Sequence, residues 1–184
     1  VHPEKPELGK KTITFGKEIY VEKSDFMIEP VKKYFRLFPG NEVRLKGAYF
    51  ITCNSYETDE NGNVTALHCT YDPETKGGNA PDGRKVKGTI HWAGPKAFKA
   101  EVRLYDRLFN VEDPAGVPDD EFVNAINPES LVVLKDCLIE EGLKDAKYLD
   151  SFQFMRNGYF CVDKDSTPEN PVFNRTVQLN SSWK

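Results

Sequence analysis

Residues 42–71 read EVRLKGAYFITCNSYETDENGNVTALHCTY, and the fold class can be inferred from this stretch. From Glu42 to Lys46 charged and apolar residues alternate, which is the pattern of a strand with one buried face. Further on, Asn61-Gly62 separates two segments rich in β-forming residues. Because Asn-Gly tolerates the positive φ angles of a tight turn, we predict that the two segments form a hairpin.

The rest of the chain repeats this organisation of short strands separated by turn residues. A second pair, Asn157-Gly158, predicts another hairpin. Helical signals are short: Ser24 is a candidate cap for a turn at residues 25–28, and residues 119–126 form a candidate helix that Pro128 ends. We predict strands at residues 12–15, 18–21, 42–46, 48–53, 64–71, 86–92, 100–105, 152–156, 159–162 and 172–179.

This density of short strands predicts a mainly β protein made of barrels or sandwiches, not a parallel sheet with crossover helices. We expect two β-barrels with short helices, each with its own apolar core. Gly94-Pro95 is the best candidate for the crossing between them.

The composition is that of a soluble globular protein, with 39% hydrophobic and 29% charged residues among 184. No apolar run approaches the ~20 residues needed to span a bilayer, so we expect no membrane partner. The N-terminus has neither a signal-peptide core nor an initiator Met, so we expect a piece of a longer cytoplasmic protein. We also expect a monomer.

The four cysteines lie far apart, at Cys53, Cys69, Cys137 and Cys161. None forms a CxxC pair, and no histidine stands at zinc-finger spacing, so no structural zinc is predicted. Without a secretory signal, we expect buried, reduced thiols and no disulfide.

The net charge of −4 hides an uneven distribution of charge along the chain. Between residues 30 and 47 five cations face the single acid Glu42, and a second basic segment runs from Arg84 to Arg107. Acids gather between Glu112 and Glu121. A local basic surface is what nucleic-acid binding depends on, whatever the net charge.

No arrangement of catalytic residues is present. The GxSxG, P-loop, GxGxxG and HExxH motifs are absent, and no nucleophile–base pair supports a freestanding hydrolase. His2, His68 and His91 are expected to be packed or surface residues, not metal ligands. The run Asp119-Asp120-Glu121 is best explained as the solvated start of a helix, because adjacent helical residues point in different directions.

The strand around Arg44 is the most informative feature for binding. Arg44 and Lys46 share one strand face, ~6–7 Å apart, and Tyr34-Phe35-Arg36 places aromatic rings beside a guanidinium. This combination suits contacts to unpaired bases. An ordinary solvated strand face and a non-catalytic double-barrel module that binds protein or carbohydrate remain alternatives. Clustering of the cations on one continuous face would favour RNA.

Six stretches, in order along nearly the whole chain, resemble the C-terminal region of bacterial glutaminyl-tRNA synthetases. They are Glu42–Tyr49, Asp82–Trp92, Val102–Phe109, Asn127–Leu131, Phe152–Cys161 without Met155 and Asn157, and Pro171–Val177. The resemblance implies a distal β-barrel at residues 24–94, inserted into a proximal β-barrel formed by residues 1–23 and 95–184. It also implies that the first strand of the proximal barrel lies upstream of Val1.

The resemblance further implies that the two barrels bind the anticodon loop of glutamine tRNA for aminoacylation in translation. The parent ligase uses ATP and Mg²⁺ in a catalytic domain of the same polypeptide. The HIGH-type and KMSKS-type motifs of that domain are absent here, so we expect this chain to hold no cofactor and to be inactive alone.

The resemblance also assigns roles to individual residues. Arg44 and Lys46 match contacts to the first anticodon base, and Arg36 matches a contact to the third. Gln153 and Arg156 match the pocket for the middle base, whose further arginine would lie upstream of Val1.

Other positions are less clear from the sequence. Lys46 stands where the family often has arginine, so the fork geometry is lost. Lys33 aligns with a frequent glutamine and Phe35 with a frequent lysine. Nothing local predicts that Gln153 and Arg156 converge, since residues i and i+3 of a regular strand face opposite ways. Arg103 and Arg107 are left out of the site, because Asp106 and nearby carboxylates can pair with them.

Overall fold

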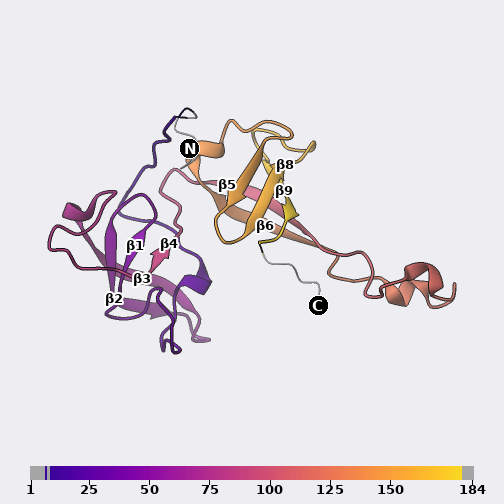
Figure 1. Ribbon diagram of the computed structural model, residues 1–184, viewed down its shortest axis with the longest axis horizontal. Coiled ribbons are helices and arrows are strands. Elements are labelled where there is room, and N and C mark those ends of the chain that lie inside the picture. The colour runs from indigo at the N-terminus through magenta and orange to yellow at the C-terminus, as the bar shows by residue number, and fades with distance from the viewer. Residues whose placement is uncertain (1–6, 8, 180–184) are drawn as a thin grey trace. The chain divides into compact units, whose positions relative to one another are not determined.

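The computed structural model describes Glu7 and residues 9–179 (Figure 1). Within this part of the chain the fold is mainly β, as predicted, with nine strands in two sheets joined by loops and short 3-10 segments. Two compact units are present: residues 14–95 form one, and the described residues before Thr14 and after Pro95 form the other. The strand order of each sheet is open.

The unit of residues 14–95 contains a four-stranded sheet with the order β3-β2-β1-β4. Strands β1 (Glu42–Leu45), β2 (Phe50–Thr58) and β3 (Val64–Asp72) pair antiparallel, and the short β4 (Thr89–Ile90) pairs parallel with β1. The β2–β3 hairpin confirms the prediction from Asn61-Gly62. Gly62 has a φ of 81°, and the Asp59 carboxylate accepts hydrogen bonds from the backbone N–H groups of Asn61 and Asn63.

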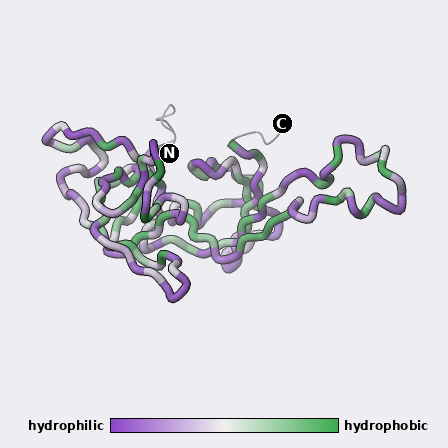
Figure 2. The backbone as a smooth tube through the Cα atoms, turned by 90° about the horizontal axis from the view of Figure 1, so that it is seen from below, coloured by the Kyte–Doolittle hydropathy of each residue, from purple (hydrophilic) through white to green (hydrophobic). Residues whose placement is uncertain are grey.

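Strand β1 shows the predicted alternation. Val43 and Leu45 are fully buried with Leu37 and Ile90, while Arg44 is half-buried. Lys46 follows directly after the strand and is exposed. Figure 2 shows hydrophobic stretches alternating with hydrophilic ones along the backbone. Burial of these side chains stabilises the unit by roughly 1.5–3 kcal/mol each.

The other unit contains a five-stranded sheet with the order β6-β5-β9-β8-β7. Its strands are β5 (Phe98–Tyr105), β6 (Leu131–Ile139), β7 (Ser151–Phe154), β8 (Gly158–Val162) and β9 (Val172–Val177). All neighbours pair antiparallel except β5 and β9. The separate core of this unit consists of Ala100, Val102, Ile139, Leu143, Phe160, Val162 and Phe173.

Between β5 and β6 a long loop, residues 106–130, runs out from the sheet (Figure 1). It contains the 3-10 segments η4 (Pro114–Gly116) and η5 (Phe122–Ala125). The candidate helix at residues 119–126 is therefore reduced to one short turn. Glu121 precedes η5 without a side-chain capping bond. Pro118 and Pro128 bound a segment too short for a regular helix.

Several predicted strands are wrong in extent. Residues 12–15 and 18–21 form no strand, and Tyr20 makes only an isolated bridge to Ala93. Phe15 instead packs its ring against Tyr49, with the centroids 4.9 Å apart, so side-chain packing replaces a backbone ladder. Of the strand predicted at residues 86–92 only β4 forms, because a neighbouring loop lies against the backbone at Gly88, directly before β4.

Two further local features differ from the prediction: a helix cap and a strand. Ser24 lies inside the 3-10 segment η2 (Lys23–Asp25) and does not cap it; Glu22 holds the N-cap position. Strand β6 was missed, because its sequence LVVLKDCLI has no alternation and six of its residues are exposed along an edge strand.

The cysteines are less buried than predicted, whereas His68 is a surface residue, which agrees with the prediction. All four cysteines are free thiols, but Cys53 alone is buried, Cys69 is exposed, and Cys137 and Cys161 are half-buried. His68 is exposed and lies 2.7 Å from a Glu57 carboxylate oxygen. His2 lies outside the described residues. Within the described residues, no helix is long and apolar enough to cross a membrane.

Candidate nucleic-acid interface

The Arg44 side chain extends from β1 and contacts residues of β2 and of the loop after β3. Its guanidinium carbon lies 4.8 Å from the centroid of the Phe50 ring, which belongs to its cross-strand partner on β2. Nη2 donates a hydrogen bond of 2.8 Å to Oδ1 of Asn79 in the loop after β3. The ring and the amide hold the guanidinium in place and leave its remaining N–H donors for a ligand.

Lys46 lies at the end of the same strand. Its backbone N–H donates to the carbonyl of Ile90, at 3.0 Å, which fixes the residue beside β4. The side chain is exposed, and no carboxylate of the described residues lies within ion-pair distance of it. Lys46 therefore presents an exposed ammonium two positions after Arg44, whose guanidinium is held by its own contacts.

Arg84 opens the second basic segment, but its charge is used within the fold. Its guanidinium pairs with three carboxylates, those of Glu42, Asp72 and Asp82. The side-chain bond from Arg84 holds the pKa of Asp72 below its ordinary value. The backbone N–H of Arg84, and then its side chain, do the same for the pKa of Asp82. Arg84 thus ties β1 to the loop after β3 and is not part of the binding surface.

Arg36 is anchored from the loop before β1. Nη1 donates to the carbonyl of Ser24 at 2.9 Å and lies 3.4 Å from Oδ1 of Asp25. The Asp25 side chain is 0% exposed, whereas that of Arg36 is 40% exposed. The guanidinium also lies 5.9 Å from the ring centroid of Tyr34. A buried carboxylate therefore positions an arginine whose outer part remains open to solvent.

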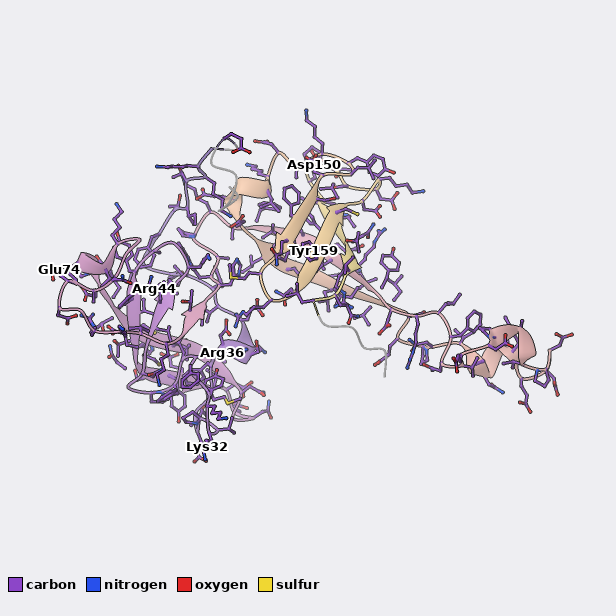
Figure 3. The ribbon with its side chains drawn as sticks, in the orientation of Figure 1. Lys32, Arg36, Arg44, Glu74, Asp150 and Tyr159 are labelled. Atoms are coloured by element: carbon purple, nitrogen blue, oxygen red, sulfur yellow. The ribbon has the colours of Figure 1, made fainter. Side chains whose placement is uncertain are left out.

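The loop of Arg36 lies against the backbone at Gly88, directly before β4. A Cβ on Gly88 would lie 1.8 Å from the carbonyl oxygen of Phe35, so only glycine allows this approach. The carbonyl of Gly88 accepts the backbone N–H of Arg44 at 2.8 Å. Arg36, Arg44 and Lys46 thus belong to one unit, in which Figure 3 labels Arg36 and Arg44.

Lys33 lies in the neighbouring turn, exposed, with a φ of 70°. A left-handed backbone is uncommon for a side-chain-bearing residue and occurs often at functional loops. Lys32, next to it, lies at the tip of the loop (Figure 3).

In the other unit, Gln153 and Arg156 lie at the β7–β8 hairpin. Gln153 is exposed on the edge strand β7, directly opposite Tyr159 of β8. Arg156 was predicted to lie in a strand, but it lies in the turn, which comprises residues 155–157. Its φ is 64°. The strand rule that separates positions i and i+3 therefore does not apply to this pair.

Arg103 has the structural role that was expected. It pairs with Glu101, Asp163 and Asp165. Asp106, the expected partner, instead accepts the backbone N–H of Arg107.

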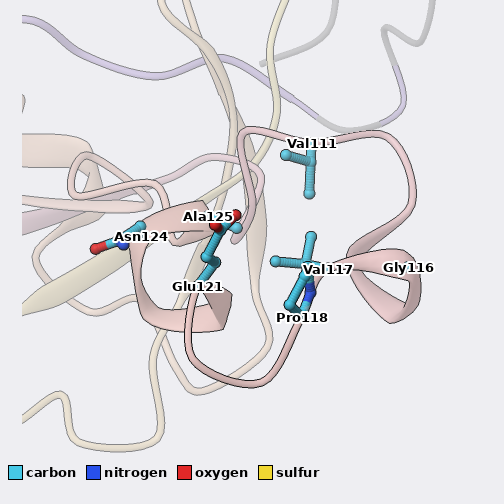
Figure 4. Close-up of a pocket in the computed structure, with 7 residues that line it drawn as sticks. All are labelled: Val111, Gly116, Val117, Pro118, Glu121, Asn124 and Ala125. Carbon is cyan, nitrogen blue, oxygen red and sulfur yellow. The ribbon is translucent and has the colours of Figure 1, made fainter.

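The described residues also form a pocket outside the candidate contacts. A pocket in the β5–β6 loop, shown in Figure 4, is lined by Val111, Gly116, Val117, Pro118, Glu121, Asn124 and Ala125. Its one carboxylate has no histidine, cysteine or second acid beside it in that lining. No group of three metal-ligating side chains occurs within the described ranges.

The sequence did not indicate which residues lie beside the candidate contacts, namely Asp25, Phe50, Asn79 and Tyr159. Asn79 is 35 positions from its partner Arg44. Asp25 is buried although it is an acid in a polar segment. Such partners come together only through the fold, and no local pattern marks them. Tyr159 could have been found as the aromatic residue that follows an Asn-Gly pair in a predicted hairpin.

Comparison with known proteins agrees with this geometry. Residues 1–72 and residues 89–163 each match the profile of a family described as "tRNA synthetases class I (E and Q), anti-codon binding domain". The chain is 54% identical over its whole length to a glutamine–tRNA ligase of Aliivibrio salmonicida and 53% identical to one of Clostridium perfringens. It is 52% identical over 99% of its length to one of Vibrio parahaemolyticus.

The chain spans about a third of the length of these relatives, 33% in each case. The two family matches cover different stretches, which together contain β1 to β8 and all six candidate contact residues. By these matches the chain belongs to the family of anticodon-binding domains of the class I tRNA synthetases for glutamate and glutamine.

Proposed function

We propose that this chain is the anticodon-reading part of a glutamine–tRNA ligase and that it binds the anticodon loop of glutamine tRNA. The observation that carries the proposal is the identity of 52–54% to glutamine–tRNA ligases along nearly the whole chain. The arginine, lysine and aromatic side chains of the candidate interface support it, because they suit unpaired bases and phosphates.

The activity of the whole ligase belongs to the proposal. Ligation of glutamine to tRNA, with ATP and Mg²⁺, would take place in the part of the polypeptide outside this chain. The parent protein would act in the cytoplasm as a monomer. The alternative of a protein- or carbohydrate-binding module has no support from the comparisons.

We assign the unit of β1–β4 to the distal barrel, at residues 24–94, and residues 1–23 and 95–184 to the proximal barrel. The compact unit at residues 14–95 interrupts the other unit in the sequence, which is what an insertion requires. In this assignment Arg44, Lys46, Arg36 and Lys33 belong to the distal barrel, and Gln153 and Arg156 to the proximal one.

A contact with the rest of the parent polypeptide is supported by the surface of β6. Leu131, Val132, Val133 and Leu134 are each between 38% and 44% exposed on this edge strand. The loop before it adds Val123, which is largely exposed. Contiguous apolar residues at an edge are characteristic of protein–protein contacts, here with the catalytic domain of the same polypeptide.

The test is the effect of Arg36→Ala on binding of anticodon stem-loops. An arginine fork to a base edge discriminates by ~1–3 kcal/mol, whereas a phosphate contact weakens all sequences alike. The variant should lose roughly 5- to 150-fold affinity for the glutamine loop and much less for a loop altered at the third letter.

Lys32→Ala is the matched control, an exposed cation four residues away. It should leave the ratio between the two loops unchanged. Equal weakening of every loop by Arg36→Ala would show that Arg36 holds the backbone and does not read a base.

A further inference from the structure

Phe35 is an exposed aromatic ring between two anchored neighbours. Its side chain is 46% exposed. Tyr34 and Arg36, on either side, both donate to the carbonyl of Ser24, at 3.2 and 2.9 Å. The Phe35 ring is therefore exposed between two neighbours whose side chains both bond to the Ser24 carbonyl.

A cation accompanies the ring. Nζ of Lys87, 52 positions later, lies 5.1 Å from the ring centroid of Phe35. Lys87 is exposed, and no acid of the described residues lies within ion-pair distance of it. An ammonium over an aromatic face is favourable by ~0.5–1 kcal/mol at an exposed site.

The backbone of Phe35 has little freedom. Its carbonyl lies in the space that a Cβ on Gly88 would occupy, and the amide of Asn41 donates to the next carbonyl, that of Arg36, at 2.7 Å. The carbonyl of Gly88 binds the backbone of Arg44. The ring is thus presented at a fixed place beside the Arg36 loop and β1, which lowers the entropic cost of using it in binding.

We propose that Phe35 and Lys87 form a stacking platform for one unpaired base of the bound RNA. The ring would stack on the base, and the Lys87 ammonium would contact that nucleotide's phosphate. This inference rests on the proposed function and deepens it. Stacking tolerates any base, because every base has a π face, so the platform adds affinity next to the base-selective arginines without adding selectivity.

The experiment uses glutamine anticodon stem-loops with 2-aminopurine at one loop position at a time. Stacking on an aromatic ring changes the fluorescence of this base analogue. For the wild-type chain, one loop position should show a change on binding that Phe35→Leu removes. Phe35→Leu should also weaken binding by roughly 5- to 150-fold, for altered anticodons as much as for the glutamine anticodon.

Three further variants separate stacking from other causes. Phe35→Trp should restore both affinity and the fluorescence change, since it keeps an aromatic face. Lys87→Met should reduce the steepness of the plot of log affinity against log salt by about one unit, because one phosphate contact is lost. Tyr20→Leu, which removes another exposed ring of the same unit, should change neither the affinity nor the fluorescence change.

The outcomes distinguish this inference from the proposed function. If the wild-type chain binds glutamine loops and Phe35→Leu keeps the same affinity and the same fluorescence change, the platform does not exist. If Phe35→Leu is weaker but Phe35→Trp is equally weak, Phe35 is a packing residue. A wild-type chain that binds no stem-loop contradicts the proposed function and this inference together.

Discussion

At the scale of single residues, the candidate contacts are held by partners that come from distant parts of the sequence. Arg36 is the clearest case, because its guanidinium lies 3.4 Å from a fully buried carboxylate, that of Asp25. The same arginine therefore supports the fold and is the proposed contact to a base. Removing either member changes the environment of the other, and the two substitutions should not be additive.

We predict a coupling of ~0.5–3 kcal/mol between Asp25→Asn and Arg36→Ala in the free energy of unfolding. Asp25→Asn keeps the shape of the side chain but removes its charge, so Arg36 loses its ion-pair partner and keeps the bond to the Ser24 carbonyl. Urea denaturation of the wild type, the two single variants and the double variant measures this coupling. Additivity within ~0.3 kcal/mol would mean that the pair has no energetic role.

The sequence predicted the burial pattern of β1 better than the contacts that its side chains make. The alternation in β1 correctly placed Val43 and Leu45 in the core and Arg44 on the other face. It did not predict that Asn79 and Phe50 would hold Arg44, because these contacts depend on how the loop after β3 folds back. Residue roles at the anticodon remain predictions from the family resemblance.

At the scale of elements, the loop after β3 depends on the ion pairs of Arg84. The pKa values of Asp72 and Asp82 lie below the ordinary aspartate value through their bonds to Arg84. The unfolded chain, with higher values, therefore binds more protons in acid. The stability from these carboxylates is complete above about pH 4 and is lost as the pH falls through their folded-state values.

We predict that Arg84→Gln lowers the free energy of unfolding of the 14–95 unit at pH 7. The difference from the wild type should shrink as the pH falls below about 4, because protonated carboxyls no longer need the cation. Urea titrations at a series of pH values measure this difference. A constant difference down to the acid limit would contradict a charge-based role for Arg84.

The β7–β8 hairpin depends on Gly158. Its φ is 134°, and a Cβ there would lie 2.5 Å from the carbonyl oxygen of Val177. Gly158→Ala should cost more than ~2 kcal/mol, since it combines backbone strain with a clash. Gly62→Ala is the control: its φ is 81° but its Cβ would meet no atom within 4 Å, so strain alone costs ~1–2 kcal/mol. Equal costs in thermal or urea unfolding would show that the clash relaxes freely.

Elements with strong turn signals were predictable, and those without were not. Asn61-Gly62 located the β2–β3 hairpin, whereas Asn157-Gly158 located a hairpin whose turn comes earlier, at residues 155–157. The bounds of that turn depend on the pairing of β8 with β9, a long-range contact. Strand β6 was missed because an exposed edge strand needs no alternation.

At the scale of the whole molecule, each of the two units has its own sheet and its own core. Leu45 is fully buried in one core and Val162 in the other. Separate cores predict separate cooperative units, which open with different free energies.

We predict that Leu45→Ala destabilises the 14–95 unit by ~2–5 kcal/mol and leaves the other unit protected. Hydrogen exchange measured by mass spectrometry should show faster exchange in β1 to β3 and unchanged exchange in β5, β8 and β9. Val162→Ala is the reciprocal variant and should show the opposite pattern. Loss of protection in both units from either substitution would mean that the chain unfolds as one unit.

The fold class followed from short strands and turns, but the function needed more than local patterns. Charge alone was ambiguous, since Arg84 and Arg103 of the second basic segment turned out to be paired within the fold. Family membership came from several ordered stretches, because no single stretch distinguishes an RNA-binding strand from a solvated one.

The central claim, that this chain reads a glutamine anticodon, is tested most directly by competition between stem-loops for the wild-type chain at low and moderate salt. We predict that a glutamine loop competes more strongly than loops altered at one letter, by roughly 5- to 150-fold per letter, which corresponds to ~1–3 kcal/mol. Affinity for all loops should fall as salt rises, while the ratio between loops persists. Equal competition by all loops at both salt concentrations would contradict the claim.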